Sequence, residues 1–158
     1  MNIELRNVKI YKGMSQETIA FNANVYVDGK KVGEASNEGH GGSNRINLFE
    51  NGRRNWELQD KCEKEAAKYT WSSDYTGETH NHSLDSYVGS LVDNEVEARD
   101  LKRKLKTQTL FRIPGESYED GEYHVMKQKY DFTVRDYLIR EYGDKVQVIN
   151  ETLTLGSN

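Results

Sequence analysis

A glycine-rich segment, residues 36–45, carries the residue types best suited to contact a ligand or a partner. Its glycines leave backbone N–H groups unobstructed, so these groups can point at a bound group. Arg45 could pair with a phosphate or a carboxylate in a forked geometry. His40 could donate a hydrogen bond or move a proton near neutral pH. We predict a contact loop, with a flexible connection or a catalytic loop as the alternatives; its other candidate residues are Asn37, Glu38, Gly41, Gly42 and Asn44.

Known phosphate-binding patterns do not match this segment. It lacks the Gly-Lys-Ser/Thr end of a P-loop and the strand-to-helix position of a dinucleotide fingerprint. A short basic cluster, Arg53 and Arg54, follows it in the chain. These two arginines could hold phosphates together with Arg45 and the glycine amides. A protein that sequesters a cyclic or phosphorylated nucleotide is therefore one alternative function.

The histidines raise the question of a metal site. His80 and His82 are two residues apart in a polar stretch, and His40 with Glu38 or Glu78 could complete a ligand set. A metal-dependent hydrolase is a further alternative on this basis. No known ligand spacing is present, however, and a zinc site needs three or four protein ligands. We therefore favour an exposed polar loop and predict no bound metal or cofactor.

Nucleophilic catalysis has little support in the sequence. The only cysteine, Cys62, lies on the apolar stripe of an expected helix, where a thiol is usually packed and unreactive. A single cysteine also excludes an intramolecular disulfide. No Gly-x-Ser-x-Gly elbow is present. We predict a protein that is not an enzyme.

The charge balance favours a soluble protein of the cytoplasm. The 158 residues carry a net charge of −4, and no stretch is apolar for long enough to cross a bilayer. This balance disfavours direct binding of DNA or RNA, which usually requires a basic face. An acidic stretch over residues 93–100 precedes a basic one over 102–106, as suits one helix and its dipole. Its acidic side, with Asp93 and Glu97, is a second candidate contact surface.

Alternation and turn residues predict a β-rich first part. A strand over residues 3–12 changes parity near Arg6 and Asn7, which indicates a β-bulge. A second strand runs from Ile19 to Val27 with one apolar face. Asp28-Gly29 suits a type I′ turn, and the chain returns from Lys30 to Ala35. An apolar patch over residues 46–49 and a turn at Asn51-Gly52 follow.

The remaining elements complete an α+β chain. Asn55 is expected to cap a helix from Trp56 to Trp71, and residues 72–82 form a loop. Ser83 caps a helix that runs to about Lys106 or breaks near Asp93-Asn94. The apolar stripe of that second helix includes Ala98. Strands over 107–113 and 123–130, a helix capped by Asp131 or Thr133 and ended by Gly143, and a last strand over 146–149 follow.

The resulting order is β-β-β-α-α-β-β-α-β, which predicts an α+β fold with a largely antiparallel sheet packed against two or three helices. We expect a single domain over residues 1–155, which could divide near 72–82, and a frayed tail over 156–158. The ten tyrosines suit either a core or an interface, so a homo-oligomer remains open.

The first third of the chain resembles small uncharacterised accessory proteins of bacteriophages and prophages. The resemblance rests on Ile10-Tyr11-Lys12-Gly13, on Thr18-Ile19-Ala20-Phe21 and on the Ser-Asn-acidic-Gly-His-Gly-Gly segment at 36–42. It implies a phage-borne protein of the host cytoplasm. Such proteins often bind and inhibit a host factor, for example a CRISPR effector or another antiviral-defence component. A non-enzymatic inhibitor of a host protein is therefore our leading expectation.

Overall fold

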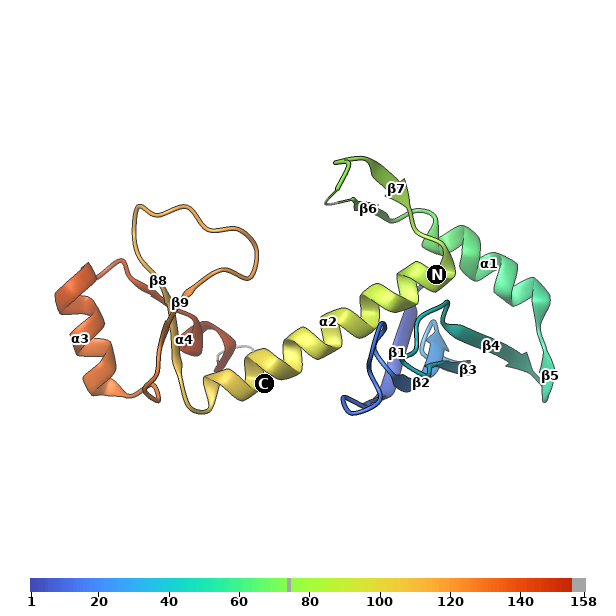
Figure 1. The fold of residues 1–158 in the computed structure, drawn as a ribbon, viewed down its shortest axis with the longest axis horizontal. Helices are drawn as coiled ribbons and strands as arrows, with labels where there is room; N and C mark the ends of the chain where they lie inside the picture. The colour runs from blue at the N-terminus through green and yellow to red at the C-terminus, as the bar shows by residue number, and fades with distance from the viewer. Residues whose placement is uncertain (74, 155–158) are drawn as a thin grey trace. The chain divides into compact units, whose positions relative to one another are not determined.

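The computed structural model describes residues 1–73 and 75–154 of the 158-residue chain. The described residues form ten strands and four helices, and the paired strands are antiparallel (Figure 1). This confirms the predicted α+β class. The strands belong to three separate sheets rather than to one. In the described part of the chain, no helix is long and apolar enough to span a bilayer.

The contacts divide the chain into two compact units, Met1–Val96 and Glu97–Asn158. The sequence predicted one domain that could divide near 72–82, whereas the division lies inside helix α2 (Leu84–Leu105). The buried side chains of α2 are Leu84, Val88 and Val92, all in the first unit. Ala98, expected on the same stripe, is exposed. The predicted frayed tail, 156–158, lies outside the described residues.

A five-stranded antiparallel sheet forms the first unit. Its strands follow one another in chain order: β1 (Ile3–Ile10), β2 (Phe21–Val27), β3 (Lys30–Asn37), β4 (Arg45–Glu50) and β5 (Arg53–Arg54). Asp28 and Gly29 have φ values of 48° and 79°, as the predicted type I′ turn requires. The register shifts between Arg6 and Lys9, and Asn7 has a φ of 55°. The predicted bulge is therefore confirmed.

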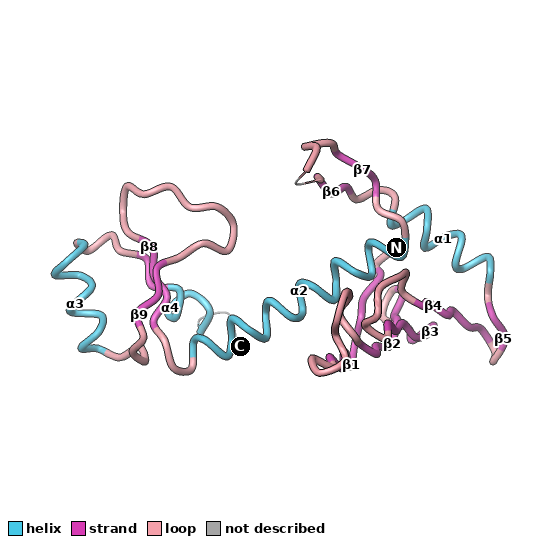
Figure 2. The backbone as a smooth tube through the Cα atoms, in the orientation of Figure 1, coloured by secondary structure: helices cyan, strands magenta, loops and turns pink. Residues whose placement is uncertain are grey.

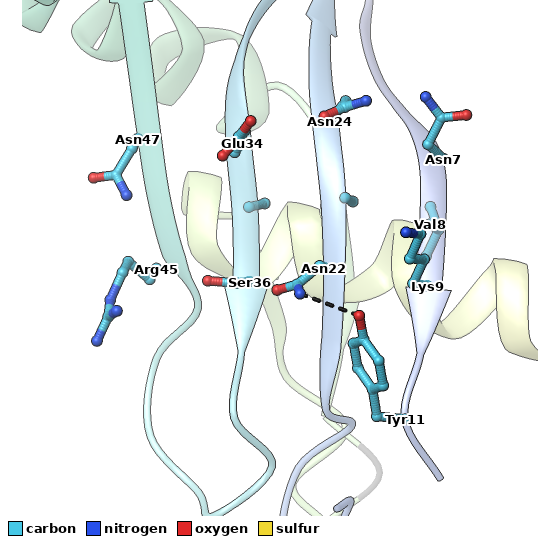
Figure 3. A pocket seen from close by; sticks show the side chains of 12 residues that line it. Asn7, Val8, Lys9, Tyr11, Asn22, Asn24, Glu34, Ser36, Arg45 and Asn47 are labelled. Atoms are coloured by element: carbon cyan, nitrogen blue, oxygen red, sulfur yellow. Dashed lines mark hydrogen bonds between the residues drawn. The ribbon is translucent and has the colours of Figure 1, made fainter.

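Two helices cover one face of this sheet. Helix α1 (Trp56–Ala66) begins at the predicted cap, where Asn55 Oδ1 accepts a hydrogen bond from the Leu58 amide at 2.9 Å. Cys62 and Ala66 of α1 join the first half of α2 and the inward side chains of the strands in one core. Figure 2 shows both helices beside the sheet strands. Among the described residues of this unit, no helix covers the opposite face of the sheet, which Figure 3 shows from the front.

The segment predicted to be a loop contains a short hairpin instead. Strands β6 (Thr70–Ser72) and β7 (Thr79–Asn81) pair with each other, and all six side chains are exposed. A strand with no buried side chain has no apolar alternation, so the pattern gave no signal for it. Helix α1 also ends at Ala66, before Trp71, because the chain turns there into β6.

The second unit has a three-stranded sheet in the order β10-β8-β9. Its elements are β8 (Thr109–Arg112), β9 (His124–Met126), α3 (Phe132–Tyr142), β10 (Gln147–Val148) and α4 (Ile149–Thr154). Asp131 caps α3 by accepting from the Val134 amide at 2.9 Å. Gly143 ends α3 with φ 86° and ψ 171°, which lies outside the left-handed helical region that we expected.

Helix α4 replaces the end of the last predicted strand. Asn150 is buried, accepts from the Leu110 amide at 2.8 Å and donates to the Gln108 carbonyl at 3.0 Å. These contacts dock the first turn of α4 against β8. Such long-range contacts stabilise this six-residue helix, which is too short to show a helical pattern of apolar residues in the sequence.

Candidate functional site

The uncovered face of the five-stranded sheet is hollowed and polar. The hollow has a volume of about 840 Å³ and receives side chains from β1, β2, β3 and β4 (Figure 3). We call this surface the outer face. Its polar members are Asn7, Lys9, Tyr11, Asn22, Asn24, Glu34, Ser36, Arg45 and Asn47.

Strand register arranges these side chains in two rows across the sheet. The first row is Lys9, Asn22, Ser36 and Arg45, and the second is Asn24, Glu34 and Asn47 with the bulge residue Asn7 at its end. Neighbouring strands are 4.7–4.9 Å apart, so each row spans about 14 Å. The first row therefore has a cation at each end and neutral hydrogen-bonding groups between them.

The outer face suits binding better than acid–base chemistry. Each asparagine amide can both donate and accept hydrogen bonds. Among the residues that line the hollow, Glu34 is the single carboxylate, and its Oε1 lies 3.3 Å from Lys31 Nζ. General acid–base catalysis uses a proton donor and a proton acceptor positioned together, whereas the ion-pair partner of Glu34 is Lys31 rather than Lys9 or Tyr11 of the lining.

Contacts within β1 and β2 mark one end of the outer face. The Arg6 guanidinium lies 4.3 Å from the Tyr26 ring centre and 2.8 Å from Glu4 Oε2. At the opposite end, Asn22 Nδ2 donates to the Tyr11 hydroxyl at 3.3 Å (Figure 3). These contacts orient the side chains before any partner binds.

The segment 36–45 is held by its own asparagines. Asn37 Oδ1 accepts from the Gly39 amide and from the Thr18 hydroxyl, each at 2.8 Å. Asn37 Nδ2 donates to Asn44 Oδ1 at 3.2 Å. Asn44 in turn binds Asp85 at the start of α2. Both asparagines were predicted to contact a ligand or a partner, and in the structure their side chains form hydrogen bonds with other residues of the chain.

Gly39 and Gly41 of this segment have structural roles. The Gly39 carbonyl accepts from the Gln16 amide at 2.9 Å, and the Gly41 amide donates to Thr18 Oγ1 at 3.3 Å. A Cβ atom at Gly39 would lie 2.4 Å from the Met14 carbonyl oxygen. The amides of Gly39 and Gly41 are thus already hydrogen-bonded within the chain.

Four polar members of the segment remain exposed: Glu38, His40, Ser43 and Arg45. They line a hollow of about 180 Å³, in which Arg45 Nη2 lies 3.9 Å from Glu38 Oε1. His40 Nδ1 lies 3.3 Å from Gln16 Oε1. Ser36 and Arg45 line this hollow and the outer face alike. The exposed part of the segment and the outer face therefore form one continuous surface.

The predicted arginine cluster is only partly assembled. Arg45 and Arg54 line a groove of about 420 Å³ that does not include Arg53 in its lining. The Arg54 guanidinium lies 3.8 Å from the Trp56 ring centre, and Arg54 Nη2 donates to Gln59 Oε1 at 3.3 Å. Arg53 is exposed on β5, opposite Glu50.

The predicted acidic residues lie in different places. Asp93 lines a groove of about 470 Å³ together with Asn37, Gly42 and Asn44 of the glycine-rich segment. Glu97 is exposed on α2, in the range of the second unit. The structure thus brings Asp93, but not Glu97, to the segment within the first unit.

The histidines of the metal-dependent alternative do not form a metal site with each other in the described residues. His80 lies beside Trp71 with ring centres 5.2 Å apart, and His82 Nδ1 contacts Ser86 Oγ at 3.0 Å. Within residues 1–73 and 75–154, no three His, Cys, Asp or Glu side chains are grouped to hold a metal ion. Cys62 is buried as predicted, and this burial raises the pKa of its thiol to about 11.

Sequence reasoning did not select the outer face. Its polar residues alternate with the buried residues of β2 and β3, which predicts one solvent-facing side but not a hollow. Asn7 and Asn47 in particular could not be recognised as members of a site from the sequence. The residues beside them in the sheet belong to other strands, and the order of residues along the chain does not show which strands are neighbours. The register is what collects four asparagines on one surface.

Comparison with known proteins gave no match to a protein-family model, to a curated protein or to a solved structure. The resemblance of the first third to phage-borne accessory proteins therefore stays a prediction.

Proposed function

We propose that this chain is a non-enzymatic accessory protein that binds a host factor and inhibits it. An antiviral-defence protein, such as a CRISPR effector, is the leading class of target. The contact surface in this proposal is the outer face together with Glu38, His40 and Arg45. The class of target rests on the phage-like first third of the sequence.

The observation that carries the proposal is the continuity of the outer face with the exposed part of segment 36–45, through Ser36 and Arg45. The polar members of the joint surface are four asparagines, Ser36, Tyr11 and Arg45, together with Lys9, His40, Glu34 and Glu38. Antibody paratopes also use Asn, Ser, Tyr and Arg, because Asn and Ser adapt their hydrogen bonds and Tyr and Arg supply strong contacts. A polar, hydrated interface with a folded protein suits this composition.

The small area of the outer face favours a contact surface that also includes the neighbouring loops. Four strands and five residues per strand cover roughly 14 by 17 Å, or about 240 Å² in projection. A stable protein interface buries about 800 Å² on each partner. The outer face therefore needs the neighbouring loops to reach the size of a protein interface.

The nucleotide alternative has less support. The amides of Gly39 and Gly41 bind side-chain oxygens of the chain itself. Arg54 is stacked on Trp56, and Arg53 does not line the same groove. A phosphate would therefore find Arg45 and Arg54 but not the cradle of amides that the sequence suggested.

The test compares two sets of surface variants for capture of the target from host lysate and for interference with host immunity. N22A/N24A/N47A alters the outer face, and E38A/H40A/R45A alters the exposed loop. The matched control, D60A/K61A/K64A, changes three exposed residues of α1. We expect both sets, but not the control, to lose capture and interference while unfolding at an unchanged temperature. Full capture and interference by both sets would contradict the proposal.

A further inference from the structure

Strand β4 has an open edge next to the proposed contact surface. On one side β4 pairs with β3 through Arg45, Ile46, Asn47 and Leu48. On the other side β5 pairs with Phe49 and Glu50 alone. In the described part of the chain, no strand pairs with this second side of β4 at Ile46.

The hydrogen-bond alternation of an antiparallel sheet shows which groups face this edge. The Leu48 carbonyl accepts a hydrogen bond from the Asn55 amide at 2.9 Å, so the backbone N–H and C=O of Leu48 point away from β3. In an antiparallel strand, the backbone groups of residues two apart point to the same side. The backbone N–H and C=O of Ile46 therefore point toward the open edge. The Asn44 amide points to the same side and donates to Asp85 Oδ1 at 2.8 Å. Ile46 is the open position between two that are filled.

A groove runs along this edge. Its volume is about 420 Å³, and its walls come from β4, from α1 through Gln59 and Glu63, and from the start of α2 through Leu84 and Asp85. Arg45 and Asn47 line both this groove and the outer face. A segment seated here would thus continue the sheet and touch the contact surface at the same time.

We infer that the edge of β4 at Ile46 binds a short extended segment of the partner protein, which adds an antiparallel strand to the sheet. The inference rests on the proposed function. Strand addition uses the unpaired backbone groups of an edge strand, and side chains of alternate residues give it specificity. The partner residue opposite Ile46 would exchange two backbone hydrogen bonds with it.

Alternation and charge define the chemistry of that segment. The residue opposite Ile46 points to the core side, where Ile46 and Leu84 lie, so it is apolar. Its two neighbours point to the outer face. The cations at this edge are Arg45 and Arg54, whereas the carboxylates of Glu63 and Asp85 accept backbone amides at 2.7 and 2.8 Å. The neighbours are therefore acidic, which gives the pattern acidic–apolar–acidic.

Hydrogen exchange of the full chain tests the open edge. We expect the Ile46 amide to exchange roughly 100-fold faster than the amides of Arg45 and Asn47, which face β3. Equal protection of all three amides would overturn the inference. Protection of Ile46 that rises with protein concentration would also overturn it, because a second copy would then occupy the edge.

A probe peptide tests the occupant. We expect Ac-Glu-Val-Glu-NH2 to shift the Ile46 amide resonance, and the same peptide with N-methylvaline not to bind, because it lacks the central N–H. Replacing both glutamates by lysine should weaken binding at least about tenfold. The variant Gln59→Trp, which fills the groove, should lose binding, whereas Lys64→Trp on the exposed side of α1 should keep it. Equal binding of the N-methylated peptide, or no binding of the first peptide, would overturn the inference.

The two proposals fail separately. If the peptide does not bind but the outer-face variants still lose the host factor, the strand addition is wrong and the proposed function stands. If the peptide binds but those variants capture the host factor fully, the proposed function is wrong.

Discussion

Asn44 joins the glycine-rich segment to helix α2 through Asp85. The Asn44 amide donates to Asp85 Oδ1 at 2.8 Å, and Asn44 Nδ2 donates to the Asp85 carbonyl at 3.1 Å. The two residues are 41 positions apart in the sequence. This contact shows that the segment is part of the scaffold of the first unit and presents its exposed side chains from a fixed backbone.

Replacing Asn44 by alanine should lower the stability of the first unit. The change removes the bond from Nδ2 to Asp85 and the bond that Oδ1 accepts from Asn37. We expect the free energy of unfolding in urea to fall by about 1–3 kcal/mol, since each bond contributes about 0.5–1.5 kcal/mol. Ser43→Ala, at an exposed neighbour, is the control and should leave it within about 0.5 kcal/mol. An equal effect of both changes would contradict this role of Asn44.

Gly39 should not tolerate a side chain. Its φ is 89°, and a Cβ atom would lie 2.4 Å from the Met14 carbonyl oxygen and 2.9 Å from Ala20 Cβ. Backbone strain alone costs about 1–3 kcal/mol at such a position, and the clash adds to it. We therefore expect Gly39→Ala to lower the thermal unfolding midpoint clearly. Gly13→Ala, where no atom lies within 4 Å of the added Cβ, should change it little.

The carboxyl group of Glu116 should titrate below its ordinary value. The hydrogen bond with His124 Nε2 at 2.8 Å and the hydrogen bond from the Tyr118 hydroxyl at 2.6 Å lower the pKa of Glu116 from 4.5. The contact therefore stabilises the fold above pH 4.5 and is lost as the pH falls through the lower folded pKa. In a carbon-13 NMR titration, we expect His124→Gln to raise the midpoint most and Tyr118→Phe to raise it less. A wild-type midpoint at 4.5 would contradict this prediction.

Cys62 should be unreactive in the folded protein. Its thiol is buried in the first core, and burial raises its pKa from 9.0 to about 11. At pH 8 we expect a thiol-specific disulfide reagent to label it slowly, and rapidly after unfolding in guanidinium chloride. Between pH 9 and 11 the unfolded thiol ionises while the folded one does not, so rising pH favours unfolding there. Fast labelling of the folded protein would show that the core around α1 opens readily.

Local signals in the sequence determined several elements of the fold. Asp28-Gly29 makes the first hairpin because both positions adopt positive φ. Asn55 and Asp131 cap their helices because a side-chain oxygen satisfies an amide within three residues. Each of these features depends on neighbours in the chain, and such features can be read from the order of residues.

Only the tertiary structure decided which residues share a surface. Asn37 and Asn44 were predicted to face a partner, but Thr18 and Asp85, distant in sequence, bind them within the fold. The four asparagines of the outer face come together through strand register, and the open edge at Ile46 exists because β5 stops after two residue pairs. The physical reason is the same in each case: the hydrogen-bond partner of a polar group is set by residues far along the chain, and the order of nearby residues does not specify it.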